Sequence, residues 1–308
     1  MTETEWLSSS DPAAMLAHLG NNISPRKLRL FACACCRLVW DGTPCPGCDG
    51  TGYSGKLTNY ANTCPQCHGT GKVVGLADPR SRRAVEVAEQ FADGLATDVD
   101  LADAGIRATE AYEERNREFE AELALVCTLQ TWAIVANSGL PRWFSVSTKH
   151  AAAQAALLRQ IVGNPWRPAI AIDPAVRTPV VLDLARQAYG GEECKCAAGW
   201  DHDAEPKPGW GTAVCETCDG SGRTPFDASA LRPLWDALAE AGCQNEEMRR
   251  ALLMEVLCGE CCAGNGLIAS HSLQAEGWYD CKCNNGWRPS PVAACRGHWV
   301  VDLILGKS

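Results

Sequence analysis

The sequence predicts an all-α fold, in which a multi-helix body carries three inserted zinc-binding β-hairpin or knuckle loops. Apolar residues recur at helical spacing along most of the 308 residues. Outside the cysteine-rich segments, few stretches show the alternation of apolar and polar residues that is typical of a strand. Twelve of the nineteen cysteines form six short pairs in three separate groups. A hydrophobic content of 46% is enough for one large or two ordinary cores. We expect one helical domain over residues 1–308, with insertions at 42–75, 190–225 and 258–291.

Several helix starts are marked by a capping residue followed by proline. Proline suits the first helical position, where its missing N–H would have no partner in the helix anyway. Four such pairs precede helical patterns: Asp11-Pro12, Ser24-Pro25, Asp78-Pro79 and Thr178-Pro179. Glycines close three segments at Gly20, Gly94 and Gly306.

The other expected helices are recognised by composition and apolar spacing. Segments 106–138 and 146–162 are rich in Ala, Glu, Arg and Leu without internal proline. A segment around Leu234 ends at Gly242, and Asn245 caps a helix expected to run through Val256. A last short helix runs from Trp299 to Leu305.

The first cysteine group predicts a structural zinc site. Cys45, Cys48, Cys64 and Cys67 belong to two copies of CxxCxGxG with fifteen residues between them. Each pair can bind one metal ion from one side. The glycines allow a tight turn, so that amide N–H groups can face the thiolate sulfurs.

The second and third groups follow the same plan less regularly, since half of their pairs are CxC. The ligands expected in them are Cys194, Cys196, Cys215, Cys218, Cys258, Cys261, Cys281 and Cys283. Cys262 competes with Cys261 for one place, and the sequence leaves that choice open. We therefore expect three structural Zn²⁺ ions, one in each insertion.

Two other uses of the cysteines are weighed against metal. Disulfides need an oxidising compartment, and the start of the sequence has no apolar stretch typical of a secretory signal, so we expect a cytoplasmic protein. A redox dithiol usually sits at a helix N-terminus on a strand–helix scaffold, whereas these pairs lie in Gly- and Pro-rich loops. Cys33, Cys35 and Cys36 fit a buried helix face and are expected in the core.

The paired motifs resemble the cysteine-rich zinc region of DnaJ-type co-chaperones. The likeness covers 45–71 well and 215–222 and 258–266 in part. It implies a zinc-binding hairpin and, more weakly, polypeptide binding. No His-Pro-Asp tripeptide occurs among the six histidines, so co-chaperone activity is not implied.

The helical remainder resembles an expanded family of uncharacterised bacterial proteins, which implies neither activity nor ligand. The resemblance is carried by Thr4–Leu7, Arg26–Cys36, Arg82–Glu89, Gly163–Pro168 and Cys295–Gly306. The three insertions depart from that family.

Charge and hydropathy narrow the choice of partner. A formal charge of −9, made more negative by zinc-bound thiolates, disfavours nucleic acid, although Arg80, Arg82 and Arg83 could form a local basic face. No apolar run approaches the length of a membrane span. Protein or unfolded polypeptide is the expected partner.

Function is expected to be non-catalytic. Four thiolates close the zinc shell and leave no place for an activated water, and the sequence has no HExxH, P-loop or GxSxG motif. We expect a zinc-binding scaffold whose hairpins mediate protein–protein interaction. The alternatives are a redox-sensitive, zinc-dependent holdase chaperone and an enzyme with an unrecognised site in the helical body. Candidate contact residues are Trp200, Trp210, Trp278 and Trp287.

Overall fold

The computed structural model describes part of the chain, and most of that part is helical, as the sequence predicts. The described residues are 1–38, 43–44, 48, 50–54, 62–64, 72–73, 78–114, 148–166, 172–191, 194, 223–257, 267–270, 277–280, 287–289 and 295–307. The contacts divide the chain into two units, Met1–Lys27 with Val135–Ser308, and Leu28–Ile134. The single domain over 1–308 stays a prediction, and each unit is described by itself.

The helices of the first unit are α1 (Glu3–Ser8), α2 (Pro12–Leu19), α8 (Thr148–Val162), α9 (Pro179–Tyr189), α10 (Leu231–Glu240), α11 (Glu246–Leu252) and α12 (Trp299–Leu305). Short 3₁₀ turns lie at η1 (Gly20–Asn22), η3 (Pro174–Val176) and η4 (Ala228–Ala230). The second unit contains α4 (Pro79–Ala92), α5 (Asp98–Glu114) and most of α3 (Pro25–Leu38). Among the described residues, no helix combines the length and apolar character needed to cross a bilayer.

The predicted caps are present at the helix starts. The Asp11 carboxylate accepts hydrogen bonds from the N–H groups of Ala13 and Ala14, at 2.9 and 3.1 Å. Asp78 accepts from the N–H of Arg80 at 2.9 Å, and Thr178 opens α9 in the same way. These bonds satisfy N–H groups that have no partner within the helix.

One helix and two helix boundaries differ from the sequence prediction. Helix α1 was not expected, although Thr2 and Glu5 form a reciprocal capping box at its start. Helix α5 begins at Asp98, well before residue 106. Helix α11 ends at Leu252 instead of continuing through Val256, because Met254 adopts a left-handed φ of 58° and Val256 joins a strand.

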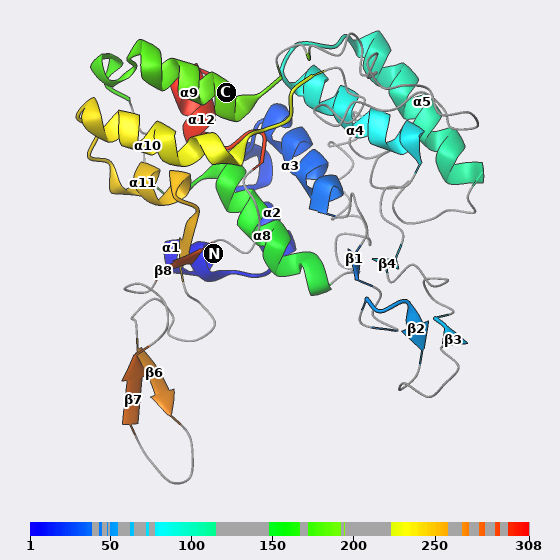
Figure 1. Ribbon diagram of the computed structural model, residues 1–308, viewed down its shortest axis with the longest axis horizontal. Helices are drawn as coiled ribbons and strands as arrows, with labels where there is room; N and C mark the ends of the chain where they lie inside the picture. The colour runs from blue at the N-terminus through cyan, green and yellow to red at the C-terminus, as the bar shows by residue number, and fades with distance from the viewer. Residues whose placement is uncertain are drawn as a thin grey trace. The chain divides into compact units, whose positions relative to one another are not determined.

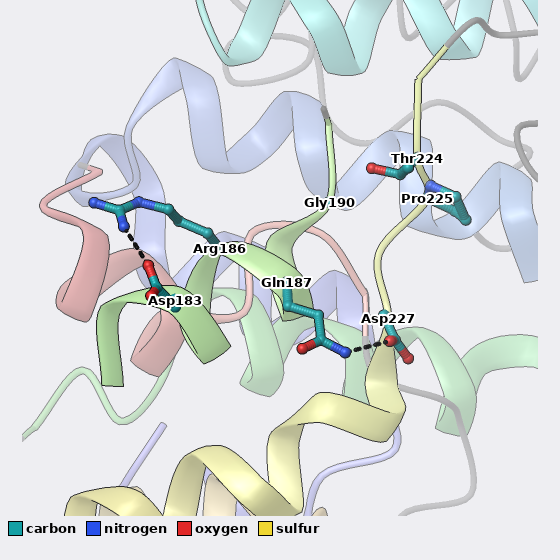
Figure 2. Close-up of a pocket in the computed structure, with 7 residues that line it drawn as sticks. All are labelled: Asp183, Arg186, Gln187, Gly190, Thr224, Pro225 and Asp227. Carbon is teal, nitrogen blue, oxygen red and sulfur yellow. Dashed lines mark hydrogen bonds and ion pairs between the residues drawn. The ribbon is translucent and has the colours of Figure 1, made fainter. Parts of the chain in front are cut away.

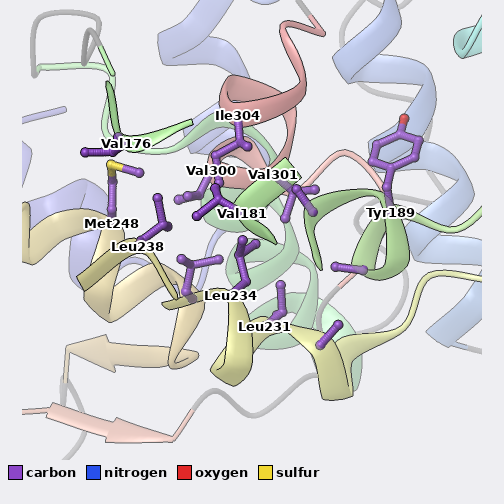
Figure 3. Packing of buried hydrophobic residues seen from close by; sticks show 14 residues of the cluster. Val176, Val181, Tyr189, Leu231, Leu234, Leu238, Met248, Val300, Val301 and Ile304 are labelled. Carbon is purple, nitrogen blue, oxygen red and sulfur yellow. The ribbon is translucent and has the colours of Figure 1, made fainter. Parts of the chain in front are cut away.

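The core of the first unit lies between α9, α10, α11 and α12 (Figure 3). Val181, Leu234, Leu238 and Val300 are completely buried there. Arg26 makes a bidentate ion pair with buried Asp302, with contacts of 2.6 and 3.1 Å. Burial of a large aliphatic side chain such as Leu234 contributes roughly 1.5–3 kcal/mol to the stability of the fold.

Two segments that carry the resemblance to bacterial proteins meet in this unit. The Trp6 indole N–H donates to the Gly163 carbonyl at 3.1 Å, and the Asn164 amide donates to Glu3 at 2.7 Å. The Trp6 and Trp166 rings lie 5.9 Å apart. Both segments therefore contribute to the packing of α1 against the end of α8.

In the second unit, α4 and α5 lie side by side (Figure 1). Cys33, Cys35 and Cys36 of α3 are buried, as predicted, and the Cys33 thiol donates to the Val85 carbonyl at 3.7 Å. The guanidinium of Arg37 binds Glu89 of α4 through two contacts of 2.7 and 2.9 Å. This unit therefore combines an apolar core with a bidentate ion pair between α3 and α4.

In the part of the chain that the structure describes, the strands form four two-stranded antiparallel ladders. In the second unit, β1 (Thr43–Pro44) pairs with β4 (Lys72–Val73), and β2 (Tyr53–Ser54) pairs with β3 (Asn62–Thr63). In the first unit, β5 (Glu255–Leu257) pairs with β8 (Trp287–Pro289), and β6 (Leu267–Ser270) pairs with β7 (Gly277–Asp280). All four ladders belong to the cysteine-rich insertions or their edges.

Candidate metal centres

Of the twelve cysteines predicted as zinc ligands, the structure describes three. Cys48 and Cys64 are buried, and Cys194 is half-buried. The other nine lie outside the described residues: Cys45, Cys67, Cys196, Cys215, Cys218, Cys258, Cys261, Cys281 and Cys283. Within the described residues, no three Cys, His, Asp or Glu side chains are grouped to hold a metal ion. Because no quartet is described in full, this finding leaves the zinc sites as predictions.

In the first insertion, one glycine connects the two described cysteines. The Gly52 N–H donates to the Cys48 sulfur at 3.2 Å, and the Gly52 carbonyl accepts from the Cys64 N–H at 2.9 Å. The turn before it is closed by the Thr51 N–H, which donates to the Cys48 carbonyl at 2.9 Å. The amide-to-sulfur contact expected from the CxxCxGxG spacing is thus present at Cys48, and Cys64, directly after β3, is hydrogen-bonded to Gly52.

The first insertion also has a nested arrangement of ladders (Figure 1). The outer ladder pairs Pro44 with Lys72, and the inner ladder pairs Tyr53 with Thr63. One CxxCxGxG segment runs from the outer to the inner ladder, and the other returns from the inner to the outer ladder. Each cysteine pair therefore belongs to one of two connections between the ladders. The outer ladder holds the two connections together at one end, and the inner ladder holds them together at the other.

The third insertion repeats this nesting. Its outer ladder pairs Leu257 with Trp287, and its inner ladder pairs Leu267 with Asp280. Cys258 directly follows the outer strand β5, as Cys45 follows β1. Two insertions with little sequence in common outside the cysteine motifs thus have the same ladder topology.

The second insertion is closed at its base by hydrogen bonds. The Gly191 N–H donates to the Thr224 carbonyl at 2.8 Å, and the Arg223 side chain donates to the Gly191 carbonyl at 2.8 Å. Gly190 has φ +65°, and a Cβ on it would lie 2.1 Å from the Pro225 carbonyl oxygen. Only glycine fits this close approach of the two ends. The spacing of the cysteines did not predict these base contacts, although Gly190-Gly191 and Thr224-Pro225 mark turns.

A pocket of about 500 Å³ lies beside this base (Figure 2). It is lined by Asp183, Arg186, Gln187, Gly190, Thr224, Pro225 and Asp227. Its polar groups bind one another: Arg186 pairs with Asp183 at 2.8 Å, and Gln187 contacts Asp227 at 3.5 Å. A hydrogen bond from Ser229 lowers the pKa of Asp227 and keeps it ionised.

Two of the three arginines that could form a basic face are paired with acids. Arg80 binds Asp78 at 3.0 Å and Glu114 at 2.6 Å, and Arg83 binds Glu86 at 3.2 Å. These carboxylates reduce the positive charge that α4 could offer to a phosphate. The pairing argues against a phosphate-binding surface there.

Two buried titratable side chains outside the insertions have strongly shifted pKa values. Burial raises the pKa of Glu86 to about 7, against the opposing effect of Arg83. Burial lowers the pKa of His298 to about 4, and its Nε2 lies 3.2 Å from the Ala251 carbonyl. His298 is completely buried directly before α12.

Comparison with protein-family models, with curated proteins and with solved structures finds no match for this chain. The two resemblances seen in the sequence therefore remain hypotheses that depend on the quoted residues alone.

Proposed function

We propose that each insertion binds one structural Zn²⁺ ion through four thiolates, and that the protein is a non-catalytic scaffold whose zinc hairpins bind a protein partner. The observation that carries the metal proposal is the Gly52 backbone, which contacts the Cys48 sulfur through its N–H and the Cys64 N–H through its carbonyl. Amide N–H groups aimed at sulfur are what a metal-bound thiolate requires as outer-shell partners.

The ladders support the same proposal for the pairs that the structure does not describe. Each cysteine-bearing connection in the first and third insertions begins at one ladder and ends at the other. A two-residue ladder such as β1–β4 or β2–β3 is too short to be stable alone in water. Metal binding, worth on the order of 10 kcal/mol per site in zinc-finger peptides, would supply the missing stability.

Metal stoichiometry tests this proposal directly. We expect about three zinc ions on the full chain by native mass spectrometry. Replacement of Cys45, Cys194 or Cys258 by serine should remove one ion in each case, whereas Cys33→Ser, at a buried helical cysteine, should remove none. A metal-free wild-type chain would overturn the proposal.

Two features support a protein partner: the net negative charge of the chain, which disfavours nucleic acid, and the aromatic residues of the third insertion. Trp278 lies in β7 and Trp287 in β8, so both belong to ladders that border the proposed metal site. Tryptophan offers a large contact area at a low cost in conformational entropy.

A display selection tests the partner proposal. Random peptides are selected on the zinc-loaded chain and counter-selected on Cys281→Ser. Peptides that bind only the loaded form support the scaffold. Suppression of the aggregation of a heat-unfolded enzyme, lost on oxidation, would instead assign a holdase.

A further inference from the structure

Helix α5 has a buried face and, opposite to it, an exposed face that is also apolar. The face that packs against α4 is formed by four buried residues, Leu101, Ala104, Ala108 and Ala111. Val99 and Ile106 lie two turns apart on the opposite face, with 77% and 61% of their surface exposed. Among the described residues, these two and Leu95, shortly before the helix, are three of the five large apolar side chains that are exposed. Their concentration in one short stretch indicates an interaction surface.

The exposed face has the spacing of a coiled-coil seam. Val99, Ala102, Ile106 and Thr109 follow one another at intervals of three, four and three residues. The Thr109 hydroxyl donates to the Gly105 carbonyl at 2.9 Å, so its polar group is satisfied within the helix. The small side chain of Ala102 allows a second helix to approach closely. A row of this kind fits a helix lying along α5.

The charges beside this row are complementary to a second copy of the same helix. Asp103 and Arg107 lie one turn apart on one edge of the row and form an ion pair at 2.9 Å. When two identical helices pack antiparallel about a two-fold axis, equivalent edges face each other in reversed order. Arg107 of each copy then lies next to Asp103 of the other, and Ala102 faces Ile106. The ion pair of a single helix becomes a ring of four alternating charges.

The same charges limit the length of the contact. Glu110 and Glu113 are exposed and interrupt the apolar row after Thr109. Four positions on each helix are a small contact for a stable complex, so the association should be weak and dependent on concentration.

From these observations we propose that α5 is a self-association surface, through which two copies of this chain form a weak antiparallel dimer. Val99 faces Thr109 and Ala102 faces Ile106 in the contact, with Asp103 and Arg107 along its edge. The dimer does not depend on the zinc sites. It would carry each insertion twice, which strengthens binding to a partner that offers repeated sites.

Sedimentation equilibrium of the full chain under reducing conditions tests the dimer. The wild type should shift with concentration from the monomer mass of 33.1 kDa towards twice that value. Ile106→Asp should raise the dissociation constant by about 100-fold or more, because each dimer then contains two unpaired acids in an apolar contact. Val180→Asp, at an exposed position on α9, is the matched control and should dimerise as the wild type does. Val99→Asp gives the same test should circular dichroism show that Ile106→Asp fails to fold.

A charge exchange tests the antiparallel arrangement. Asp103→Arg makes the edge of the row basic, and Arg107→Asp makes it acidic, so each variant alone should dimerise about tenfold more weakly than the wild type. An equimolar mixture of the two variants should regain the wild-type affinity, because a basic edge then faces an acidic one. A small molecule or an unrelated helix bound to this face would not produce this recovery.

Three results overturn the proposal. The first is a wild type that keeps the monomer mass at about 100 μM, where a contact of this kind should be populated. The second is a dimer that Ile106→Asp leaves intact, which assigns association to another surface. The third is a mixture of the charge variants that associates no better than either variant alone, which rules out the antiparallel pairing of Asp103 with Arg107.

Discussion

The helices around α9–α12 and the first insertion are stabilised by different interactions. Between α9, α10, α11 and α12, large aliphatic side chains such as Leu234 and Leu238 are completely buried. In the first insertion, among the residues whose burial is described, the buried side chains are those of Cys48 and Cys64. The helical region can therefore be stable through apolar burial, whereas the described residues of the insertion contribute two short ladders and two buried thiols.

This difference indicates where the proposed zinc ions would contribute most to stability. Apolar burial is distributed over many side chains, so no single one is essential. Under the proposal, zinc–thiolate bonds would supply order to the first insertion at one point. We expect the two regions to respond to different perturbations.

Removal of zinc should have the largest effect, confined to the insertions. With a strong chelator under reducing conditions, we expect the amides of Gly52 and Cys64 to lose protection from hydrogen exchange, since on the order of 10 kcal/mol of local stability depends on each site. Amides of α9, α10 and α12 should keep their protection. Exchange followed by mass spectrometry measures both regions in one sample. Equal protection of Gly52 and Cys64 with and without chelator would contradict the comparison.

Leu234→Ala should have the reverse pattern. Leu234 is completely buried in α10, so its truncation should cost about 2–5 kcal/mol in the free energy of unfolding of the first unit. The number of bound zinc ions should not change. Val180→Ala, at a position on α9 that is 60% exposed, is the control and should change stability by about 0.5 kcal/mol or less. For both variants, urea unfolding measures the free energy of unfolding, and native mass spectrometry of the folded protein counts the bound zinc ions.

The sequence predicted the helical region far better than the insertions, because its signals are local. Asp78 and Pro79 are adjacent, so the start of α4 can be found from two residues. The capping box of Thr2 and Glu5 is an equally local signal for the start of α1. The end of α11 could not be found in this way. Val256 fits the apolar spacing of a helix, but it pairs with Arg288 across the whole third insertion.

In the proposed metal sites, too, the sequence predicted local contacts and not contacts between distant residues. The CxxCxGxG spacing predicted an amide directed at sulfur, and the Gly52 contact with Cys48 has this geometry. The nesting of two ladders could not be predicted, because each ladder joins strands whose pairing depends on distant residues. The base contact of Gly190 with Pro225 depends likewise on a tertiary approach that no local motif marks.

Acid should weaken the helical region through His298. Its folded pKa of about 4 is below the ordinary value of 6.5, so between these pH values the unfolded chain binds a proton that the folded chain does not. Stability from this group is complete above pH 6.5 and falls as the pH decreases, by about 2 kcal/mol between pH 7 and 5.

The readout is a difference between variants, because zinc–thiolate sites also weaken in acid. His298→Gln should lose about 2 kcal/mol less than the wild type between the two pH values in urea unfolding. An identical pH dependence in the two proteins would show that His298 does not titrate as its burial requires.

The smallest expected effect tests the boundary between the helices and the third insertion. The Asn245 side chain accepts a hydrogen bond from the Met248 N–H at 2.9 Å and caps α11, which is followed directly by β5. Asn245→Ala should therefore cost about 1 kcal/mol in the free energy of unfolding, and Asn245→Ser, which keeps a capping oxygen, should recover most of it.

Both variants should retain the zinc of the third insertion, because β5–β8 pairing and not the helix cap holds the ends of that segment together. Loss of one ion from Asn245→Ala alone would instead show that α11 and the third insertion fold as one unit, and the contrast between the two regions would then hold only for the first insertion.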